Sequence, residues 1–247
     1  MADPAPRILV FVPTYEERDN VQPMLAELRR HAPGADILFM DDRSSDGTGE
    51  LLDALAKDEP RLKVVHRPAK LGIGSAHLDA IIYAYDHGYD RLVTLDCDFT
   101  HSPSDIPVLL AKSDEVGLTI GSRFLGVDSL PGWTLPRRLL TNMGHLLTMS
   151  VLGVRGDATG AFRVYRLAQI PRAMFALVTS RGYAFFFESL FIAHQNGVTI
   201  GEVPIRLPPR TQGHSKMSFG EIRRSLEHLL RLFVASKTHP ERFRIQT

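Results

Sequence analysis

Short apolar runs alternate with amphipathic segments along the first half of the chain. Apolar runs of this kind predict buried strands, and apolar positions three or four residues apart predict helices. The expected strands cover residues 8–12, 37–40, 62–65, 92–95 and 117–120. The expected helices cover residues 21–30, the segment around 51–55, and residues 75–87. Strands that alternate with such helices are typical of βαβ units, so the pattern predicts an α/β, Rossmann-like fold with a mostly parallel sheet.

The pattern changes after about residue 122. A loop that contains Pro131 and Gly132 leads to an expected helix over residues 137–152. The remaining expected elements are strands over 161–165 and 198–205, an aromatic-rich helix near 185–194 and a last helix over about 219–236. Because no linker-like stretch separates the halves, we expect a single domain, residues 1–247, with a C-terminal subregion.

Charge and cysteine content exclude several classes of protein. The 29 basic and 28 acidic residues give a formal net charge of +1, which provides no overall field for binding nucleic acid. The single cysteine, Cys97, cannot form an internal disulfide or a cysteine-based zinc site, which fits a reducing compartment. No apolar run approaches the ~18 residues of a membrane span, and the N-terminus lacks a signal-peptide pattern. We therefore expect a protein that is soluble or peripheral to a membrane.

Two acidic side chains follow the fourth predicted strand. Asp96 and Asp98 lie two residues apart, directly after residues 92–95. In a parallel sheet, the loops at the carboxyl ends of the strands build the binding site. Two carboxylates there can bind one Mg²⁺ or Mn²⁺ together with substrate phosphates. The alternative is a solvated turn, which is the commoner role of two acids at this spacing.

The first two predicted strands end in residues that suit a nucleoside. Tyr15 can stack on a base, and Glu17 can accept a hydrogen bond from a base amine. Asp41 and Asp42 follow the second strand, where a carboxylate can bind a ribose or a base. The alternatives are packing of the tyrosine over the sheet end and a capping or turn role for the aspartates.

Five basic residues lie in loops that contain glycine, proline or serine: Lys70, Arg123, Arg137, Arg210 and Lys216. Loops carry many binding residues, and both lysine and arginine bind phosphate groups, although any one of the five could be a solvated surface charge. The sequence contains no serine-hydrolase elbow, His-Glu-x-x-His zinc motif or Gly-x-x-x-x-Gly-Lys phosphate loop. The glycine-rich segment 70–74 also lacks the Rossmann spacing.

In chain order, these segments resemble the motifs of family 2 glycosyltransferases with the GT-A fold, and more narrowly those of the dolichol-phosphate (polyprenol-phosphate) mannose synthases. The resemblance extends from about residue 8 to about residue 237. Its segments are VPTYEE (12–17), DDRSSDGT (41–48), KLGIGS (70–75), LDCDFTHSP (95–103), GSRF (121–124), GWTLPR (132–137), DATGAFRVYR (157–166), IGEVPI (200–205) and RTQGHSK (210–216). Each segment alone is weakly specific, but all of them in the right order over one chain are strongly specific.

The resemblance implies that residues of about 7–125 bind a nucleotide-sugar donor. The donor's nucleotide would contact Pro13, Tyr15, Glu17, Asp42 and Lys70. Asp96 and Asp98 would bind a divalent metal, Mg²⁺ or Mn²⁺, together with the diphosphate.

The resemblance assigns acceptor binding to the subregion of about 126–247. Arg137, Arg210 and Lys216 would hold the acceptor's phosphate or help the diphosphate to leave. Arg123 would lie near the phosphates. Asp157 occupies the position often considered for a base, and the alternatives for it are an orienting or a structural acid.

The sequence departs from the family pattern at several positions. Glu16 stands where Asn is usual, and Arg43 stands where Gly is common. Thr100 replaces a common Gln or Ser, and His145 replaces a common helix Asn. Glu188 occupies the family's acidic position on the aromatic-rich helix.

The activity that the resemblance implies is the metal-dependent, inverting transfer of a hexose, mannose from GDP-mannose, to a polyprenyl or dolichyl phosphate. Transfer of glucose from UDP-glucose to a polyprenyl phosphate and a non-catalytic nucleotide-sugar-binding protein are the alternatives. A sugar-nucleotide pyrophosphorylase is disfavoured, because residues 13–17 replace the glycine-rich loop that such an enzyme has after its first strand.

Two expected helices are relevant to whether the protein associates with a membrane. Residues 137–152 and 221–237 combine apolar and basic side chains, a pattern of helices that lie on a membrane surface. The same pattern arises when a helix packs on its own core. With a lipid-phosphate acceptor, we expect a cytoplasmic protein, peripheral at the cytosolic face of a membrane, and a membrane-anchoring partner protein is compatible with this location.

Overall fold

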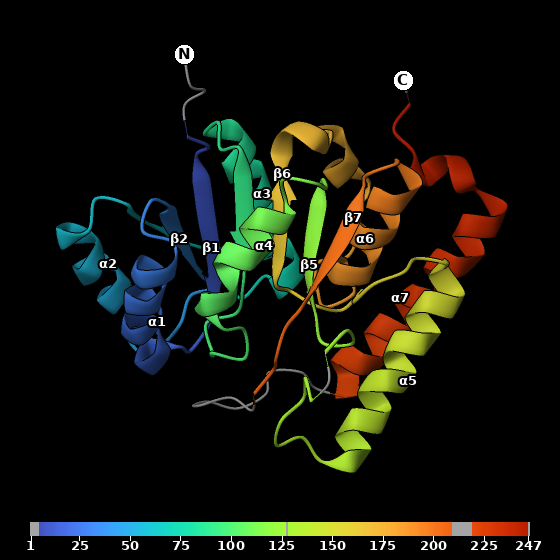
Figure 1. Cartoon of the computed structure of the whole chain (residues 1–247), viewed down its shortest axis with the longest axis horizontal. Coiled ribbons are helices and arrows are strands. Elements are labelled where there is room, and N and C mark those ends of the chain that lie inside the picture. Colours follow the sequence, from blue (N-terminus) through green and yellow to red (C-terminus); the bar gives the residue numbers. More distant parts are fainter. Residues whose placement is uncertain (1–4, 127, 209–218, 247) are drawn as a thin grey trace.

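The computed structural model describes residues 5–126, 128–208 and 219–246. A seven-stranded sheet lies at the centre, with helices on both faces (Figure 1). Its strands are β1 (Ile8–Thr14), β2 (Asp36–Asp41), β3 (Leu62–His66), β4 (Arg91–Thr94), β5 (Leu118–Ser122), β6 (Arg163–Arg166) and β7 (Ile200–Pro204). Every strand expected from the sequence is present, within a few residues of the predicted bounds.

The order of strands across the sheet is β3-β2-β1-β4-β6-β5-β7. Pairing is parallel between β1 and β2, β1 and β4, β2 and β3, and β5 and β7. Strand β6 runs antiparallel to both of its neighbours, β4 and β5. The sheet is therefore mostly parallel, as predicted, and the carboxyl ends of β1, β2, β4 and β5 point to the same edge.

The helices follow the predicted segments, with one addition. They are α1 (Arg18–His31), α2 (Thr48–Asp58), α3 (Ile73–Asp86), α4 (Ile106–Lys112), α5 (Leu135–Leu152), α6 (Phe185–Gln195) and α7 (Phe219–Thr238). Short 3-10 helices cover Pro103–Asp105, Leu167–Gln169, Arg172–Leu177 and Pro240–Phe243. The sequence analysis missed α4, because its seven residues are too few to display a helical period.

Strand β1 shows how the sheet supports a core on each face. Leu9 and Phe11 belong to the core beneath α3 and α6. Val10 and Val12 belong to the core beneath α1, α2 and α4. Successive side chains of a strand point to opposite faces, so a strand covered on both sides is apolar throughout. The uninterrupted apolar run at the start of the chain is thus explained by burial on both faces.

Helices α5 and α7 pack against each other at one end of the molecule (Figure 1). The exposed large apolar side chains that the structure describes here are Leu135, Leu139, Met143, Leu146 and Leu147 on α5, and Ile222, Leu226, Leu230, Phe233 and Val234 on α7. We call these residues the α5–α7 apolar face. Leu229 and Leu232 of α7 point inward and are buried. Across the described part of the chain, no helix is both long enough and apolar enough to cross a membrane.

Candidate active site

A cavity of about 430 Å³ opens at the carboxyl ends of β1, β2 and β4, and we call it the strand-end cavity. The residues in its wall that the sequence predicted are Pro13, Tyr15, Glu17, Asp42, Lys70, Asp96 and Asp98. The sequence analysis missed other wall residues from α3 and from the C-terminal half, among them Ile73, Ala76, Gly182, Tyr183 and Glu221. The fold therefore brings together side chains from segments that lie far apart in the sequence.

Tyr15 and Lys70 contact each other in this wall. The ammonium nitrogen of Lys70 lies 3.9 Å from the centre of the Tyr15 ring, which is a cation–π contact. Glu17 is fixed nearby, because its carboxylate accepts a hydrogen bond of 2.6 Å from the side chain of Asn20. Its backbone N–H donates to the hydroxyl of Thr48 at 3.0 Å. An aromatic face, a cation and a carboxylate thus line one part of the cavity.

The two aspartates after β2 have different surroundings. Asp41 accepts hydrogen bonds from the backbone N–H and the hydroxyl of Ser44, at 2.9 and 2.5 Å, and so shapes the following turn. Asp42 forms a buried ion pair with Arg67. Of the two aspartates, Asp42 lines the cavity. The turn role considered from the sequence therefore describes Asp41.

Arg67 supports the site and was missed by the sequence analysis. Its side chain is only 4% exposed. It donates to the hydroxyl of Ser75 at 2.5 Å and to the carboxylate of Asp79 at 3.0 Å. These contacts hold Asp42 against the first turns of α3. The signal that could have revealed Arg67 is its position directly after β3, at the same sheet edge as the other site residues.

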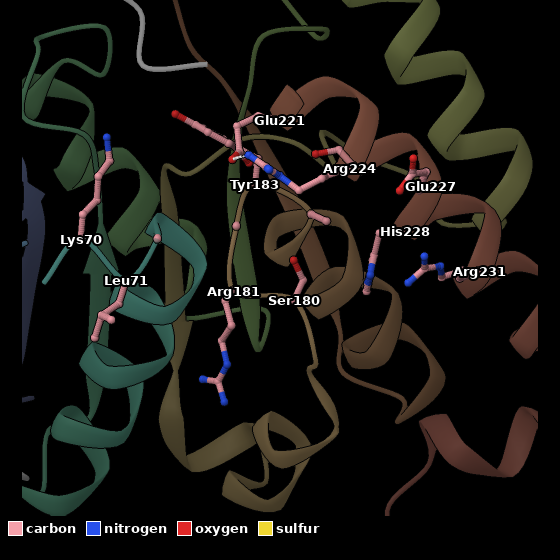
Figure 2. A pocket seen from close by; sticks show the side chains of 14 residues that line it. Lys70, Leu71, Ser180, Arg181, Tyr183, Glu221, Arg224, Glu227, His228 and Arg231 are labelled. Carbon is pink, nitrogen blue, oxygen red and sulfur yellow. Dashed lines mark hydrogen bonds and ion pairs between the residues drawn. The ribbon is translucent and has the colours of Figure 1, made fainter. Parts of the chain in front are cut away.

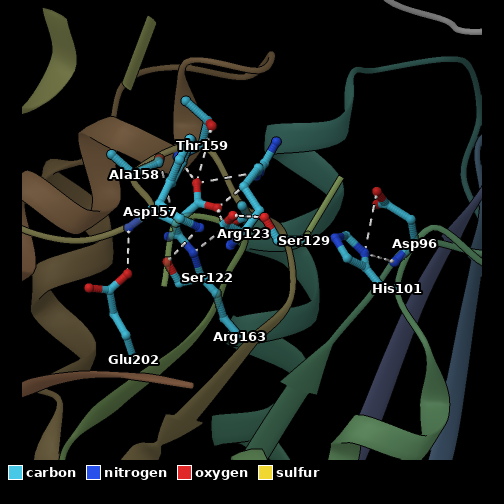
Figure 3. Close-up of polar contacts among 12 residues, drawn as sticks. Asp96, His101, Ser122, Arg123, Ser129, Asp157, Ala158, Thr159, Arg163 and Glu202 are labelled. Carbon is cyan, nitrogen blue, oxygen red and sulfur yellow. Dashed lines mark hydrogen bonds and ion pairs between the residues drawn. The ribbon is translucent and has the colours of Figure 1, made fainter. Parts of the chain in front are cut away.

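The two acids after β4 are oriented by their own loop. Asp98 is 3% exposed, and its Oδ1 accepts hydrogen bonds from the backbone N–H and the hydroxyl of Thr100, at 3.1 and 2.6 Å. The backbone N–H of Asp96 donates to Nδ1 of His101 at 3.1 Å (Figure 3). The carboxylate of Asp96 also lies 3.5 Å from this nitrogen. Thr100, one of the departures from the family pattern, thus orients Asp98.

Asp96 and Asp98 fit a hard divalent cation that is shared with a substrate. Both line the strand-end cavity. Among the described residues, no group of three or more His, Cys, Asp or Glu side chains could hold a metal ion. Mg²⁺ prefers octahedral oxygen ligands and often takes one or two carboxylates together with substrate phosphates. The donor set therefore suits a metal bound together with a diphosphate.

A second polar cluster lies at the carboxyl end of β5 (Figure 3). Arg123 Nε donates to Oδ2 of Asp157 at 2.7 Å, and the backbone N–H of Thr159 donates to Oδ1 at 3.2 Å. Asp157 is fully buried. Burial alone would raise the pKa of the Asp157 carboxyl, but the charge and hydrogen bonds of Arg123, with the bond from Thr159, outweigh it and lower the pKa. Asp157 is therefore an ionised partner of Arg123.

Two further side chains complete this cluster. Glu202 Oε1 accepts a hydrogen bond of 3.0 Å from the backbone N–H of Asp157. His145 of α5 stacks on Phe124, with ring centroids 3.7 Å apart and an interplanar angle of 10°. Burial lowers the pKa of His145, and the nearby carboxylates of Asp157 and Glu202 oppose that shift. The imidazole is therefore neutral at pH 7.

Three described residues that the sequence assigned to the site, Arg123, Arg137 and Asp157, do not line the strand-end cavity. Arg123 and Asp157 form the separate cluster, and Arg137 stacks on Trp133, with its guanidinium carbon 3.7 Å from the ring centroid. Arg210 and Lys216 lie outside the described residues.

A second cavity of about 630 Å³ adjoins the first (Figure 2). The two share the wall residues Lys70, Gly72, Gly182, Tyr183 and Glu221. The rest of the second wall comes largely from α7 and the loop before α6, including Ser180, Arg181, Arg224, Glu227, His228 and Arg231. The C-terminal helix thus closes one side of the site.

Two glycines at the start of α3 allow the backbone of the loop before α6 to pack closely against this helix. Gly72 has a φ of +96°, and a Cβ there would lie 2.6 Å from the carbonyl oxygen of Arg181. A Cβ on Gly74 would lie 2.5 Å from the carbonyl oxygen of Gly182. The glycine-rich segment 70–74 therefore serves close backbone packing at the cavity wall.

Two departures from the family pattern fall on unusual backbone conformations. Glu16 has a φ of +54° and Arg43 a φ of +59°. The Asn and Gly of the family pattern enter this left-handed region more readily than Glu and Arg. Glu16 is held by hydrogen bonds from the backbone N–H and hydroxyl of Ser45, at 2.8 and 3.0 Å, and Arg43 donates to the carbonyl of Pro68 at 3.1 Å.

Comparison with known proteins identifies the family. Residues 9–170 match the family described as Glycosyl transferase family 2. The undecaprenyl-phosphate mannosyltransferase of Micrococcus luteus is 33% identical over 240 residues, which cover 97% of this chain and 99% of that protein. The polyprenol monophosphomannose synthase of Mycolicibacterium smegmatis is 36% identical over 226 residues, which cover 90% of this chain and 85% of that protein.

Solved structures confirm the expected GT-A fold. The glucosyl-3-phosphoglycerate synthase of Mycobacterium tuberculosis, in complex with phosphoglyceric acid, matches with a TM-score of 0.62 and 17% identity, over 94% of this chain and 80% of that chain. A mannosyltransferase from Pyrobaculum calidifontis, in complex with GDP-Man and Mn²⁺, matches with a TM-score of 0.54 and 16% identity, over 96% of this chain and 65% of that chain. The family match and the two relatives show that this chain belongs to glycosyl transferase family 2.

Proposed function

We propose that this protein transfers mannose from GDP-mannose to a polyprenyl or dolichyl phosphate, with inversion at the sugar. The observation that carries the proposal is the identity of 33% and 36% to two relatives named as polyprenyl-phosphate mannosyltransferases, over 97% and 90% of this chain. The strand-end cavity supports it, because acidic, aromatic and basic side chains there suit a nucleoside diphosphate.

The nucleotide of the donor would occupy the part of the cavity formed by β1 and β2. Tyr15 offers an aromatic face for a base, and Lys70 lies over the same ring. Asp42 offers a carboxylate to the ribose or base, held in place by Arg67. Glu17 and Pro13 complete this wall. Residues of about 7–125 would thus form the nucleotide-sugar-binding half.

Asp96 and Asp98 would hold Mg²⁺ or Mn²⁺ together with the diphosphate. When bound, the metal supplies positive charge that stabilises the departing nucleoside diphosphate. The mannosyltransferase of Pyrobaculum calidifontis was solved with GDP-Man and Mn²⁺, which supports this assignment. Thr100 keeps Asp98 oriented through its two hydrogen bonds.

Asp157 would orient Arg123 and would not act as a base. Its carboxylate is fully buried, both oxygens already accept hydrogen bonds, and its lowered pKa makes it a weak base. A lipid phosphate is already ionised near neutral pH, so its oxygen can attack the anomeric carbon without a strong base. As that bond forms, the bond between the anomeric carbon and the diphosphate oxygen breaks. Arg123, held by Asp157, would stabilise the charge that develops on the phosphates.

The acceptor would bind on the side of the C-terminal subregion, residues of about 126–247. Arg137 lies in the first turn of α5, beside the α5–α7 apolar face. With Arg210 and Lys216 it would hold the acceptor's phosphate, since guanidinium and ammonium groups bind anionic oxygens. Such an arrangement brings a charged headgroup to the site and leaves the isoprenoid chain beside the exposed apolar side chains.

The α5–α7 apolar face would hold the protein at the cytosolic face of a membrane. Among the described residues of these two helices, ten large apolar side chains are exposed, and arginines and a lysine lie among them on α7. Exposed apolar patches of this kind mark interaction surfaces, and adjacent basic residues favour anionic lipid surfaces. A membrane-anchoring partner protein is the alternative occupant of this face.

A donor panel tests the proposal. Purified protein is incubated with polyprenyl phosphate, Mn²⁺ or Mg²⁺, and either GDP-mannose or UDP-glucose, and the lipid product is identified by mass spectrometry. We expect mannosyl lipid from GDP-mannose, and no product when a chelator is present in excess. Glucosyl lipid from UDP-glucose alone would establish the alternative donor. Nucleotide binding without any product would indicate a non-catalytic nucleotide-sugar-binding protein.

A further inference from the structure

Glu188, in the first turn of α6, is buried at 2% exposure and lines neither cavity. Its Oε1 accepts hydrogen bonds from the backbone N–H and the hydroxyl of Thr179, at 3.1 and 2.7 Å. Its Oε2 accepts one of 2.7 Å from the backbone N–H of Ser180. Nε2 of His228, on α7, lies 3.2 Å from the same oxygen. One buried carboxylate therefore joins the loop before α6 to α7.

These contacts keep Glu188 ionised. Burial would raise the pKa of its carboxyl, but the nearby His228 imidazole and the hydrogen bonds from Thr179 and Ser180 outweigh burial and lower the pKa. A buried charge is stable only when its partners stay in place. The loop and the helix are thus fixed to each other by the electrostatic cost of separating them.

The loop that Glu188 holds packs on the start of α3. The carbonyl oxygen of Arg181 accepts a hydrogen bond of 3.0 Å from the backbone N–H of Ser75. The hydroxyl of Ser75 accepts a bond of 2.5 Å from Arg67, which pairs with Asp42 in the strand-end cavity. Hydrogen bonds, together with the backbone of residues 180 and 181, therefore connect Glu188 to Asp42 through Ser75 and Arg67.

The helix that Glu188 holds also reaches the cavity. Glu221 lines both cavities, and His228 follows it by seven residues, two helical turns, on the same side of α7. Arg224 lies between them and pairs with Glu221. Figure 2 shows His228 and Glu221 projecting from α7 toward the loop that carries Ser180 and Tyr183. His228 and Glu221 therefore share the side of α7 that borders this loop.

We infer that Glu188 and His228 are positioning residues for the donor, because their contact holds Tyr183 and Glu221 in the wall of the strand-end cavity. The inference rests on the proposed function, in which this cavity binds the nucleotide-sugar. Neither residue of the pair touches the cavity metal ligands Asp96 and Asp98. Breaking the pair should therefore weaken donor binding and leave the chemical step largely intact.

The test compares His228→Ala with the conservative variant His228→Gln. The Kd for GDP with Mn²⁺ is measured by calorimetry, and KM and kcat are measured with GDP-mannose and polyprenyl phosphate. His228→Ala should raise Kd and KM roughly tenfold, as expected for the loss of a contact to a charged group, with kcat changed less than about twofold. His228→Gln can still donate an amide N–H to Glu188 and should restore most of the affinity.

A histidine–glutamate pair elsewhere on the chain gives a matched control. His239 lies 3.4 Å from Glu241 at the surface, and His239→Ala should leave Kd, KM and Tm unchanged. If His228→Ala does not fold, Glu188→Gln carries the same comparison, because it keeps the shape of the side chain and removes its charge. Wild-type affinity in a folded His228→Ala that has a lowered Tm would overturn the inference and leave the pair a purely structural role. A wild-type protein that binds no GDP at all would refute the proposed function itself.

Discussion

The strand-end cavity and the α5–α7 apolar face are built on opposite principles. In the cavity, the polar side chains that project from the strand ends are held by partners within the chain, as Asp42 is held by Arg67 and Asp98 by Thr100. On the α5–α7 face, Leu139, Leu146 and Leu230 are 62%, 61% and 54% exposed. One region has its polar side chains held in place before a ligand arrives, whereas the other exposes apolar surface that no described residue covers.

This contrast separates the effects expected from mutation. Changes in the strand-end cavity or the Arg123–Asp157 cluster should reduce catalysis or donor binding, since the side chains there are held in position to stabilise charge on the donor's diphosphate. Changes on the α5–α7 apolar face should leave folding and donor binding intact and affect attachment to lipid. The four predictions that follow test this separation, from the largest expected effect to the smallest.

Asp98→Asn should reduce transfer on the order of 10³-fold, because it removes an anionic ligand from a hard cation at the diphosphate. The amide keeps the shape of the side chain, so Tm should change by only a few degrees. Steady-state kinetics with Mn²⁺ in excess, together with thermal unfolding, measure both effects. Asp53→Asn is the control, because Asp53 is 60% exposed, pairs with His66 and lines neither cavity. An Asp98→Asn enzyme with wild-type turnover would rule out the metal-dependent mechanism.

Asp157→Asn should reduce kcat roughly tenfold to a hundredfold, by releasing Arg123, and should lower the free energy of unfolding by about 3 kcal/mol. Because folding lowers the pKa of Asp157, the ionised carboxylate stabilises the folded protein at every pH above its ordinary pKa of about 3.9. That contribution is lost as the pH falls from about 4 through the lower, folded-state pKa. Denaturant unfolding between pH 7 and pH 3 should show this loss in the wild type and not in the variant.

The exposed pair of Asp86 and Arg172, with a contact of 2.7 Å, supplies the control for that measurement. Asp86→Asn should change stability by less than about 1 kcal/mol, since surface ion pairs contribute little. Equal losses from Asp86→Asn and Asp157→Asn would contradict the role of the buried pair.

Replacing Leu226 and Leu230 together by Glu should weaken binding to anionic lipid vesicles about tenfold or more. Burial of a leucine side chain stabilises by roughly 1.5–3 kcal/mol, and two carboxylates would also be repelled by the lipid. Vesicle co-sedimentation measures the effect, and the Kd for GDP should remain that of the wild type. Val108→Glu, on the exposed side of α4, is the control. Unchanged vesicle binding by the double variant would assign the α5–α7 apolar face to a partner protein.

Arg43→Gly should stabilise the protein by about 0.5–1 kcal/mol, because glycine adopts the left-handed backbone of residue 43 without strain. The gain is reduced by the loss of the hydrogen bond to Pro68 and by the greater freedom of glycine in the unfolded chain. Chemical denaturation measures it. Arg30→Gly, on an exposed helical position of α1, should instead destabilise by about 1 kcal/mol.

The sequence predicted one half of the strand-end cavity and missed the other half for a physical reason. Pro13, Asp42 and Asp98 lie at or just after the ends of strands. Because parallel strands end at the same edge of the sheet, the local sequence pattern was sufficient to predict that these residues share a site. Tyr183 and Glu221 reach the same cavity through the packing of α6 and α7. The spacing of apolar residues within one helix does not reveal how two helices pack, so the sequence could not place these residues. The reversal of β6 was equally hidden, because a buried strand has the same apolar pattern in either direction.

The two glycines at the start of α3 set a limit on how this protein could be redesigned for another sugar nucleotide. Libraries that randomise a binding pocket usually treat every wall position as free to vary. Positions 72 and 74 are closed, because any side chain there would collide with the backbone of residues 181 and 182 and push the two walls apart. Ile73 lines the same cavity and is only partly buried, whereas Ala76 is 1% exposed and belongs to the core. Useful diversity should therefore be placed at residue 73, and most variants at positions 72 and 74 should have a distorted site.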